Sequence, residues 1–307
     1  MKRNAQDSIR GIWPPLMLEV TPDGAIDYDV LKETAHYFAQ AGVHGLYTGD
    51  TASEFYTLEY EEWDELAVAA REIIGDTGLP AGIGCTWTNQ AGALRRIAKA
   101  RELGYDNIHL SPPYWIKLNA ASLESYWRAV AGVAGDLPIF VYAGSQGQFP
   151  LDAALVKRLR EWCPAIAGIK SAGFDPVVAN GLLIHHPDLA HFVHEQVLCG
   201  LVAMGASGCF SALVGLCPAL VMKWHGMIER GEWEEAFAIQ RRVNRFYDEG
   251  VQPVRRAGYV VDKALSELGG VPGATRKLRA PYAPLPDELR EILRTAADRH
   301  LPEYREK

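Results

Sequence analysis

AIAGIKS, residues 165–171, is the stretch from which we deduce the fold of this chain. It is a short apolar run between Pro164 and Gly173, and such a run is typical of a fully buried strand. The strand ends on Lys170, where burial would disfavour the charged ammonium. Lys170 is therefore a candidate amine nucleophile, although a surface or ion-paired lysine just beyond a strand explains this stretch equally well when it is taken alone.

The same pattern recurs on both sides of this stretch, from Gly11 to Gly215, as an apolar strand, a polar turn and an amphipathic helix. Each unit takes about 30 residues, which is the usual length of a βα repeat. Eight such units predict an α/β fold, a closed (β/α)8 TIM barrel, with an open doubly wound sheet as the alternative. The strands are expected at Ile12–Val20, Gly45–Gly49, Pro80–Cys85, Asn107–Ser111, Pro138–Tyr142, Ala165–Lys170, Leu189–His194 and Gly208–Ala212.

After the eighth strand the pattern changes to helices alone. They are expected at Pro218–Arg230, Glu232–Asp248, Pro253–Leu268 and Pro286–Arg299. The first of them completes the barrel as its eighth helix, and no low-complexity linker separates the others from it. We therefore predict a barrel over residues 1–230, which carries the active site, and a C-terminal helical appendage over residues 231–307 packed on the barrel.

The composition argues against two classes of partner. The chain has 307 residues, of which 48% are hydrophobic and 22% charged, with a formal net charge of −7. A nucleic-acid surface would normally bring a basic patch, and no apolar run approaches the length of a membrane span. The amino terminus lacks the apolar core of a signal peptide, and the five cysteines form no Cys-x-x-Cys pair. We expect a cytoplasmic protein with reduced cysteines.

Polar side chains follow several of the expected strands, where the carboxyl ends of a barrel place its functional residues. Tyr142 and Lys170 end neighbouring strands one repeat apart, so they should lie at equal height. A lysine beside a phenol and hydroxyl groups suits Schiff-base chemistry, in which the amine attacks a ketone and a hydroxyl relay moves protons. The backbone N–H groups around residues 51–53, near a helix start, can receive a carboxylate. The alternative is that Tyr142 is a core residue without a catalytic role and that the loop at residues 51–53 only caps a helix.

Four segments, in this order, resemble the dihydrodipicolinate synthase and N-acetylneuraminate lyase family of class I aldolases. They are Glu54–Leu58, Ile139–Tyr142, Gly168–Lys170 and Gly205–Ser211. The resemblance extends from about Gly11 to Pro286. It implies that Lys170 forms an imine with a 2-oxo acid such as pyruvate, that Tyr142 relays protons and that Thr51 continues the relay.

The resemblance also implies the binding residues. The amides of Thr51, Ala52 and Ser53 would hold the substrate carboxylate, and Phe210 belongs to the eighth-strand segment that would border the substrate. Tyr114 matches a tyrosine that reaches the site of a neighbouring subunit in some members, so a homotetramer or a dimer is implied. Glu195, with His194, is expected to meet the variable end of the substrate. The second reactant would be an aldehyde.

No cofactor or metal ion is expected, because Schiff-base chemistry needs neither. The histidines 185, 186, 191 and 194 lie close together in the sequence, and a metal site there is the alternative.

Two departures from the family pattern limit the assignment. Thr51-Ala52-Ser53 stands where the family has Thr-Thr-Gly, and Gly147 stands where the synthase has an arginine for the carboxylate of its second substrate. We therefore predict a Schiff-base lyase that acts at C3 of a pyruvate-like 2-oxo acid and is not the lysine-biosynthesis synthase. Aldol cleavage is favoured, of a 2-oxo-3-deoxy sugar acid or of an arylidene pyruvate with accompanying hydration.

Three alternatives remain open at this point. One is a dehydratase or hydratase-aldolase that uses the same imine on a 2-oxo-3-deoxy acid or an arylidene pyruvate. Another is a catalytically silent barrel that binds a metabolite. The last is a phosphate-binding barrel that uses the small residues Gly205–Gly208 near the eighth strand.

Overall fold

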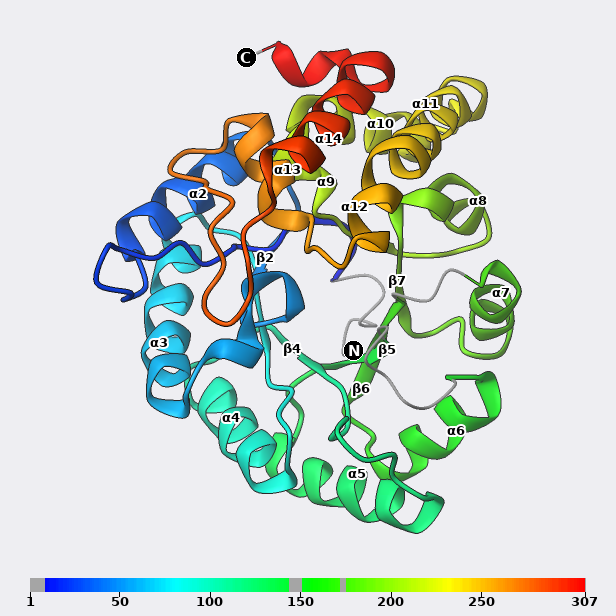
Figure 1. Ribbon diagram of the computed structural model, residues 1–307. Helices are drawn as coiled ribbons and strands as arrows, with labels where there is room; N and C mark the ends of the chain where they lie inside the picture. Colours follow the sequence, from blue (N-terminus) through cyan, green and yellow to red (C-terminus); the bar gives the residue numbers. More distant parts are fainter. Residues whose placement is uncertain (1–8, 144–150, 172–174, 307) are drawn as a thin grey trace.

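Eight parallel strands form a nearly closed barrel in the computed structural model, which describes residues 9–143, 151–171 and 175–306 (Figure 1). The strand order is β1-β8-β7-β6-β5-β4-β3-β2, and backbone hydrogen bonds join the segment that follows β1 to β2, such as the one from Leu16 N–H to Tyr47 O at 2.7 Å. The predicted barrel is confirmed and the open sheet is wrong. The strands are β1 (Gly11–Trp13), β2 (Leu46–Thr48), β3 (Ala81–Gly84), β4 (Asn107–Leu110), β5 (Ile139–Ala143), β6 (Ile166–Ser171), β7 (Ala190–Val193) and β8 (Gly208–Phe210).

Most strands are shorter than predicted, and the first strand shows why. The apolar run Ile12–Val20 was expected to be one strand, but β1 ends at Trp13 because Pro14 and Pro15 have no N–H to donate to a neighbouring strand. The apolar residues that follow are buried without belonging to a strand. Among them, Met17 lies against Ser266 of the C-terminal helices, with Sδ 3.8 Å from the Ser266 hydroxyl.

Helices follow the strands around the outside of the barrel (Figure 1). Several begin at an Asp or Asn whose side chain accepts a hydrogen bond from a backbone N–H of the first turn, as Asp27, Asn89, Asn119 and Asp152 do. These caps fix where each helix leaves its loop. The helices are α2 (Tyr28–Gln40), α3 (Tyr60–Asp76), α4 (Gln90–Glu102), α5 (Ala120–Ala134), α6 (Ala153–Trp162), α7 (Pro176–His185), α8 (Leu198–Ala203), α9 (Leu213–Leu216) and α10 (Pro218–Glu229).

The C-terminal helices cover one side of the barrel opening (Figure 1). They are α11 (Trp233–Phe246), α12 (Gln252–Arg256), α13 (Asp262–Gly269) and α14 (Asp287–His300), followed by the short 3-10 helix η5 (Pro302–Arg305). A single π-helical turn, η4 (Tyr247–Val251), joins α11 to α12. The predicted helix Pro253–Leu268 is wrong, because Gly258 adopts a φ of +84° and the chain breaks there into α12 and α13.

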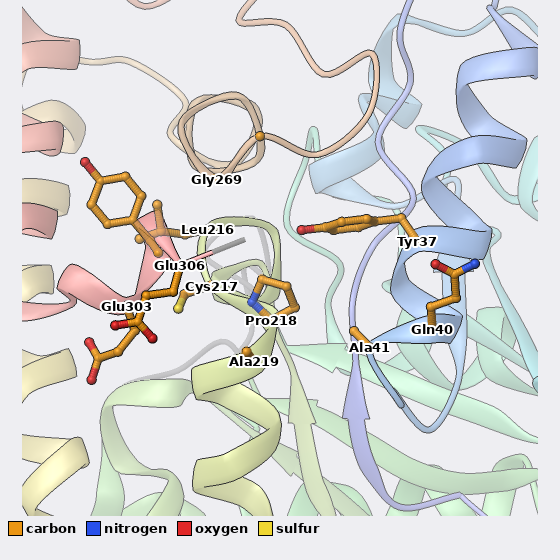
Figure 2. A pocket seen from close by; sticks show the side chains of 12 residues that line it. Tyr37, Gln40, Ala41, Leu216, Cys217, Pro218, Ala219, Gly269, Glu303 and Glu306 are labelled. Atoms are coloured by element: carbon orange, nitrogen blue, oxygen red, sulfur yellow. The ribbon is translucent and has the colours of Figure 1, made fainter.

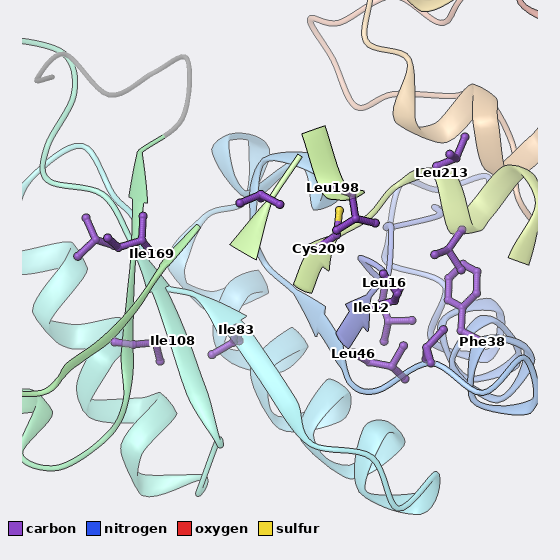
Figure 3. Packing of buried hydrophobic residues seen from close by; sticks show 14 of the residues in the cluster. Ile12, Leu16, Phe38, Leu46, Ile83, Ile108, Ile169, Leu198, Cys209 and Leu213 are labelled. Atoms are coloured by element: carbon purple, nitrogen blue, oxygen red, sulfur yellow. The ribbon is translucent and has the colours of Figure 1, made fainter. Parts of the chain in front are cut away.

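Two apolar layers build the core. Successive strand residues face opposite sides of the sheet, so Ile12, Leu46 and Ile169 pack outward against the helices (Figure 3). The inward-facing residues are aromatic and include Trp13, Tyr47, Phe140, Phe192 and Phe210. Phe192 and Phe210 stack with ring centroids 4.2 Å apart. This aromatic packing fills the middle of the barrel.

Two further sequence expectations can be compared with the fold. All five cysteines are buried, and none is disulfide-bonded to another. In the described ranges, no helix combines the length and the apolar character that crossing a membrane requires.

Candidate active site

A cavity of about 610 Å³ lies above the aromatic core, at the carboxyl ends of the strands. Its inner wall comes from the barrel and includes Thr51, Ala52, Tyr142 and Lys170. Its outer wall comes from the C-terminal helices and their connections, from Tyr247 to Asp262. The structure therefore brings the predicted nucleophile and its predicted relay into one cavity of a size that is usual for small-molecule sites.

Lys170 and Tyr142 lie side by side. They are register partners on the neighbouring parallel strands β6 and β5, which confirms the predicted equal height. Lys170 is only 9% exposed, and its Nζ lies 4.6 Å from the centroid of the Tyr142 ring and 4.2 Å from that of Tyr47. Aromatic faces attract a cation at such distances. The amine is thus held at the floor of the cavity with one side open to a ligand.

Asp50 is the partner of Lys170. The Lys170 Nζ donates a hydrogen bond of 2.6 Å to Asp50 Oδ2, and the Asp50 side chain is 1% exposed. Burial alone would raise the pKa of this carboxyl, but the Lys170 charge and the hydrogen bond from His109 outweigh burial and hold the pKa well below its usual value. Asp50 is therefore an anion in contact with the Lys170 nitrogen.

His109 approaches the same carboxylate oxygen from inside the barrel. Its Nδ1 lies 2.8 Å from Asp50 Oδ2, and its ring is fully buried. Burial and the Lys170 charge lower the pKa of His109 to about 4, against the opposing effect of Asp50. The neutral ring donates Nδ1–H to Asp50, and Nε2 has no hydrogen-bond partner within the described ranges. Asp50 is thus fixed by a second donor that carries no charge at pH 7.

Sequence reasoning missed both of these residues. Asp50 directly precedes the predicted turn at residues 51–53 and His109 lies within the predicted fourth strand, but neither was given a role. A usable signal existed for His109, since it occupies the inward-facing position between Ile108 and Leu110 of β4. An imidazole among apolar residues at such a position needs a hydrogen-bond partner.

The Tyr142 and Thr51 side chains are joined by a hydrogen bond. Burial and the nearby negative charge of Asp50 raise the pKa of the Tyr142 phenol, so the phenol is protonated at neutral pH. Thr51 and Ala52 lie in the short 3-10 helix η1 (Thr51–Ser53), which follows β2. A chain of two hydroxyl groups thus runs beside the Lys170 amine, as a proton relay requires.

Two of the predicted binding residues lie elsewhere. Ser53 is fully buried and donates its hydroxyl to the Leu16 carbonyl at 2.7 Å, so it does not border the cavity. Tyr114 lies outside the cavity lining and packs edge-to-face on Phe55, with ring centroids 6.3 Å apart. Gly147, which stands where the synthase has an arginine, lies outside the described residues.

Glu195 and Phe210 border the cavity, as does His194. The Glu195 carboxylate is 2% exposed and accepts a hydrogen bond of 2.8 Å from the Ser211 hydroxyl. Its second oxygen lies 3.3 Å from His194 Nε2. Burial lowers the pKa of His194. Glu195 therefore ties the end of β7 to the end of β8 and presents His194 to the ligand space.

The histidine cluster does not form a metal site. The ring of His191 is hydrogen-bonded to the His186 carbonyl at 2.8 Å, and the ring of His186 to the Ala153 carbonyl at 2.8 Å. In the part of the chain that the structure describes, the one cluster of metal-ligand type is His44, His225 and Glu229, at the amino end of the barrel. His44 Nδ1 accepts the Ile12 N–H at 3.1 Å, so the neutral ring carries its proton on Nε2 and lacks a lone pair there for a metal.

A second cavity, of about 400 Å³, lies between α2, α10 and the C-terminal segment (Figure 2). Tyr37 faces it from one side and Glu303 and Glu306 from the other. Its one thiol belongs to Cys217, and burial raises the pKa of this group to about 11. A thiol is a poor nucleophile under these conditions. The chemistry of the chain is therefore assigned to the cavity around Lys170.

Comparison with known proteins agrees with the fold. A model of the dihydrodipicolinate synthetase family matches residues 8–299. A protein named an uncharacterized DapA-like lyase, from Thermococcus onnurineus, is 27% identical over 294 residues, which cover 93% of this chain and 97% of that protein. The 4-hydroxy-tetrahydrodipicolinate synthase of Prochlorococcus marinus is 29% identical over 288 residues, covering 89% of this chain and 90% of the synthase.

A solved structure shows the same fold. The YagE protein of E. coli K12, a member of the dihydrodipicolinic acid synthase family solved in complex with pyruvate, superposes with a TM-score of 0.84 at 24% identity. The match covers 95% of this chain and 98% of that one.

Proposed function

Because the chain belongs to the dihydrodipicolinate synthetase family, we propose that it is a lyase in which Lys170 forms an imine with a pyruvate-like 2-oxo acid and a carbon–carbon bond at C3 of that acid is broken or formed. One observation carries this proposal. The Lys170 amine lies at the floor of a ligand-sized cavity, between an anion at Asp50 and a phenol at Tyr142. The complex of the related YagE protein with pyruvate supports the choice of acid.

Imine formation uses the groups around Lys170. The neutral amine attacks the C2 carbonyl carbon, and the carbonyl oxygen takes up a proton to give a carbinolamine. A second proton, supplied through the Tyr142–Thr51 pair, lets this oxygen leave as water, and the C=N bond forms. The nitrogen is then a cationic iminium, next to the Asp50 oxygen that lies 2.6 Å from Nζ in the free protein. Asp50 would stabilise that charge by direct contact.

Bond cleavage follows from the electron demand of the iminium. When the C4 hydroxyl loses its proton, the C3–C4 bond breaks, its electron pair moves to C3 and the iminium becomes an enamine. The C4 fragment leaves as an aldehyde. A proton returned to C3 restores the iminium, and water then releases pyruvate and the free amine. In dehydration the C3 proton is lost instead and the C4 hydroxyl leaves, so that all carbons stay in one product.

The substrate carboxylate would bind at η1. The Ala52 N–H points from the first turn that follows β2 and donates to no acceptor in the described ranges, whereas the Thr51 N–H donates to Asp50 Oδ1 at 3.1 Å. Backbone N–H groups at such a turn favour an anion. Ala52 therefore remains a proposed binding residue through its N–H, whereas Thr51 contributes its hydroxyl to the proposed relay and Ser53 supports the turn from behind.

We also propose that copies of the chain associate through the loop that follows β4. Trp115 and Ile116 of this loop are 81% and 75% exposed, next to Tyr114. Exposed apolar groups of this size usually mark a protein contact. Sedimentation velocity of the wild type and of Trp115→Ser tests the assembly: a lower sedimentation coefficient is expected for the variant, and an unchanged one would place the interface elsewhere.

The function is tested by trapping the imine. The protein is incubated with pyruvate and borohydride, which reduces the C=N bond to a stable amine, and the adduct is located by peptide mass spectrometry. An adduct on Lys170 that is absent in Lys170→Ala is the expected result. Its absence from the wild type, with pyruvate and larger 2-oxo acids alike, would overturn the proposal. Release of free pyruvate from a 2-oxo-3-deoxy acid then distinguishes cleavage from dehydration.

A further inference from the structure

The cavity is much larger than a three-carbon acid requires. Its inner end, at Lys170 and Ala52, would be filled by pyruvate alone, whereas the remainder of the 610 Å³ extends toward the C-terminal helices. The groups that border this outer part include Tyr247, Arg255 and Asp262. A substrate that matches the whole cavity would therefore have a second fragment, and these side chains would select it.

The π-helical turn η4 begins at one of these side chains, Tyr247, and determines where another, Arg255, points. A π turn holds one residue more than an α turn, and such turns occur frequently at functional sites. Without the extra residue, every position beyond it would be rotated by about 100° around the helix axis. With it, Tyr247 packs against His194, with ring centroids 5.1 Å apart, and Arg255 lines the cavity with its guanidinium carbon 5.9 Å from the Tyr247 ring centroid.

Arg255 brings a positive charge to the cavity, and no carboxylate of the described residues forms an ion pair with it. In the described ranges its guanidinium forms no hydrogen bond and no ion pair, although Asp262 lines the same cavity. Burial raises the pKa of the Asp262 carboxyl, and the Arg255 charge opposes this rise from a distance. Most other arginines of the C-terminal region are paired with a carboxylate, namely Arg230, Arg242, Arg276, Arg279, Arg290, Arg294, Arg299 and Arg305.

We propose that Arg255 binds a carboxylate at the far end of the substrate, so that the enzyme acts on 2-oxo dicarboxylic acids and the second reactant is an aldehyde that carries an acid group. This inference rests on the proposed imine at Lys170, which fixes the other end of the same molecule. A guanidinium presents a planar pair of donors that matches a carboxylate, and its charge survives at every physiological pH. Arg255 is thus a specificity residue and takes no part in the bond-breaking steps.

The test compares acids that differ only in the distal group. Borohydride trapping at Lys170 is measured against concentration for 2-oxoglutarate, 2-oxoadipate and 2-oxopimelate, and for 2-oxopentanoate, 2-oxohexanoate and 2-oxoheptanoate. In the wild type, at least one diacid is expected to reach half-maximal trapping at a concentration about tenfold lower than the monoacid of equal length. Arg255→Gln should abolish that preference. Arg256→Gln, in the neighbouring residue that does not line the cavity, should retain it.

The outcomes separate the two proposals. If pyruvate is trapped at Lys170 but no diacid is preferred at any length, or no longer acid is trapped, the role of Arg255 is overturned while the imine stands. The same holds if the preference survives Arg255→Gln. If the wild type traps no 2-oxo acid at all, the proposed function itself fails.

Discussion

Two buried lysines of this chain, Lys170 and Lys263, have opposite surroundings. Lys263 is 3% exposed, and its Nζ lies 3.1 Å from Glu54 Oε1, 3.7 Å from Glu19 Oε1 and 2.5 Å from the Lys277 carbonyl oxygen. Three acceptors surround an ammonium that has three protons. Lys263 therefore holds the loops after β1 and β2 to the segment that precedes α14, and it borders no part of the Lys170 cavity.

Lys170 has one carboxylate, that of Asp50, and otherwise faces aromatic rings and the ligand space. The two lysines have similar burial, so burial does not distinguish a nucleophile from a structural cation. The number of N–H groups that already have an acceptor distinguishes them. An amine whose N–H groups are all hydrogen-bonded to the protein cannot approach a substrate. The following predictions test this difference, from the largest expected effect to the smallest.

Lys170→Arg should abolish turnover, with a loss of at least about 10⁴-fold, because a guanidinium keeps the charge beside Asp50 and cannot form the imine. The steady-state rate of pyruvate release is the measurement, with circular dichroism as the control for folding. Substantial turnover in this variant would remove Lys170 from the reaction.

Lys263→Met should lower the free energy of unfolding by about 3–5 kcal/mol, because it leaves the carboxylates of Glu54 and Glu19 buried without their cation. Urea unfolding measures this loss. Imine trapping at Lys170 should persist in the folded variant, unlike in Lys170→Arg.

The matched control is Lys277→Met. It changes an exposed side chain and keeps the carbonyl that Lys263 contacts, so its stability should stay within about 0.5 kcal/mol of the wild type. If Lys263→Met lowers the free energy of unfolding no more than Lys277→Met does, the ion pairs of Lys263 contribute nothing to stability.

Asp50→Asn should slow imine trapping by about 10²–10³-fold, since the variant loses the anion that contacts the iminium nitrogen. The rate of borohydride trapping with saturating pyruvate is the measurement. A rate equal to that of the wild type would reduce Asp50 to a structural partner of His109.

His109→Asn should make the free energy of unfolding less dependent on pH in the acidic range. The native pKa of about 4 lies below the usual 6.5, so the unfolded chain binds more protons between these values and the free energy of unfolding falls as the pH is lowered from 6.5 to 4. Asparagine keeps an N–H donor for Asp50 and does not titrate. Between pH 7 and pH 5 the wild type should lose about 1–2 kcal/mol more than the variant in urea unfolding. Parallel losses in the two proteins would contradict a neutral His109.

Sequence spacing predicted the barrel and the equal height of Tyr142 and Lys170 because both depend on local repetition. Tyr142 and Lys170 are one βα unit apart, and this interval sets their register on neighbouring strands. Asp50 meets Lys170 across the barrel, 120 residues away in the chain, and nothing local to either residue indicates that contact.

Other features were beyond prediction for different reasons. Ser53 and Thr51 belong to one turn, yet one faces the core and the other the cavity, which depends on where the turn sits on the barrel. Helix α7 lacks the amphipathic pattern expected of a helix in the repeat, because its sequence PVVANGLLIH is apolar on nearly every side and has no 3.6-residue contrast.

The π turn η4 has an evolutionary consequence. Loss of one residue between Tyr247 and Val251 would convert η4 into an ordinary α turn and carry Arg255 about 100° around the helix. The strands that hold Lys170 and Tyr142 and the loop that holds Asp50 would be untouched. A change in the length of this helix, with no change at the reacting groups, is thus a short mutational route from one substrate to another.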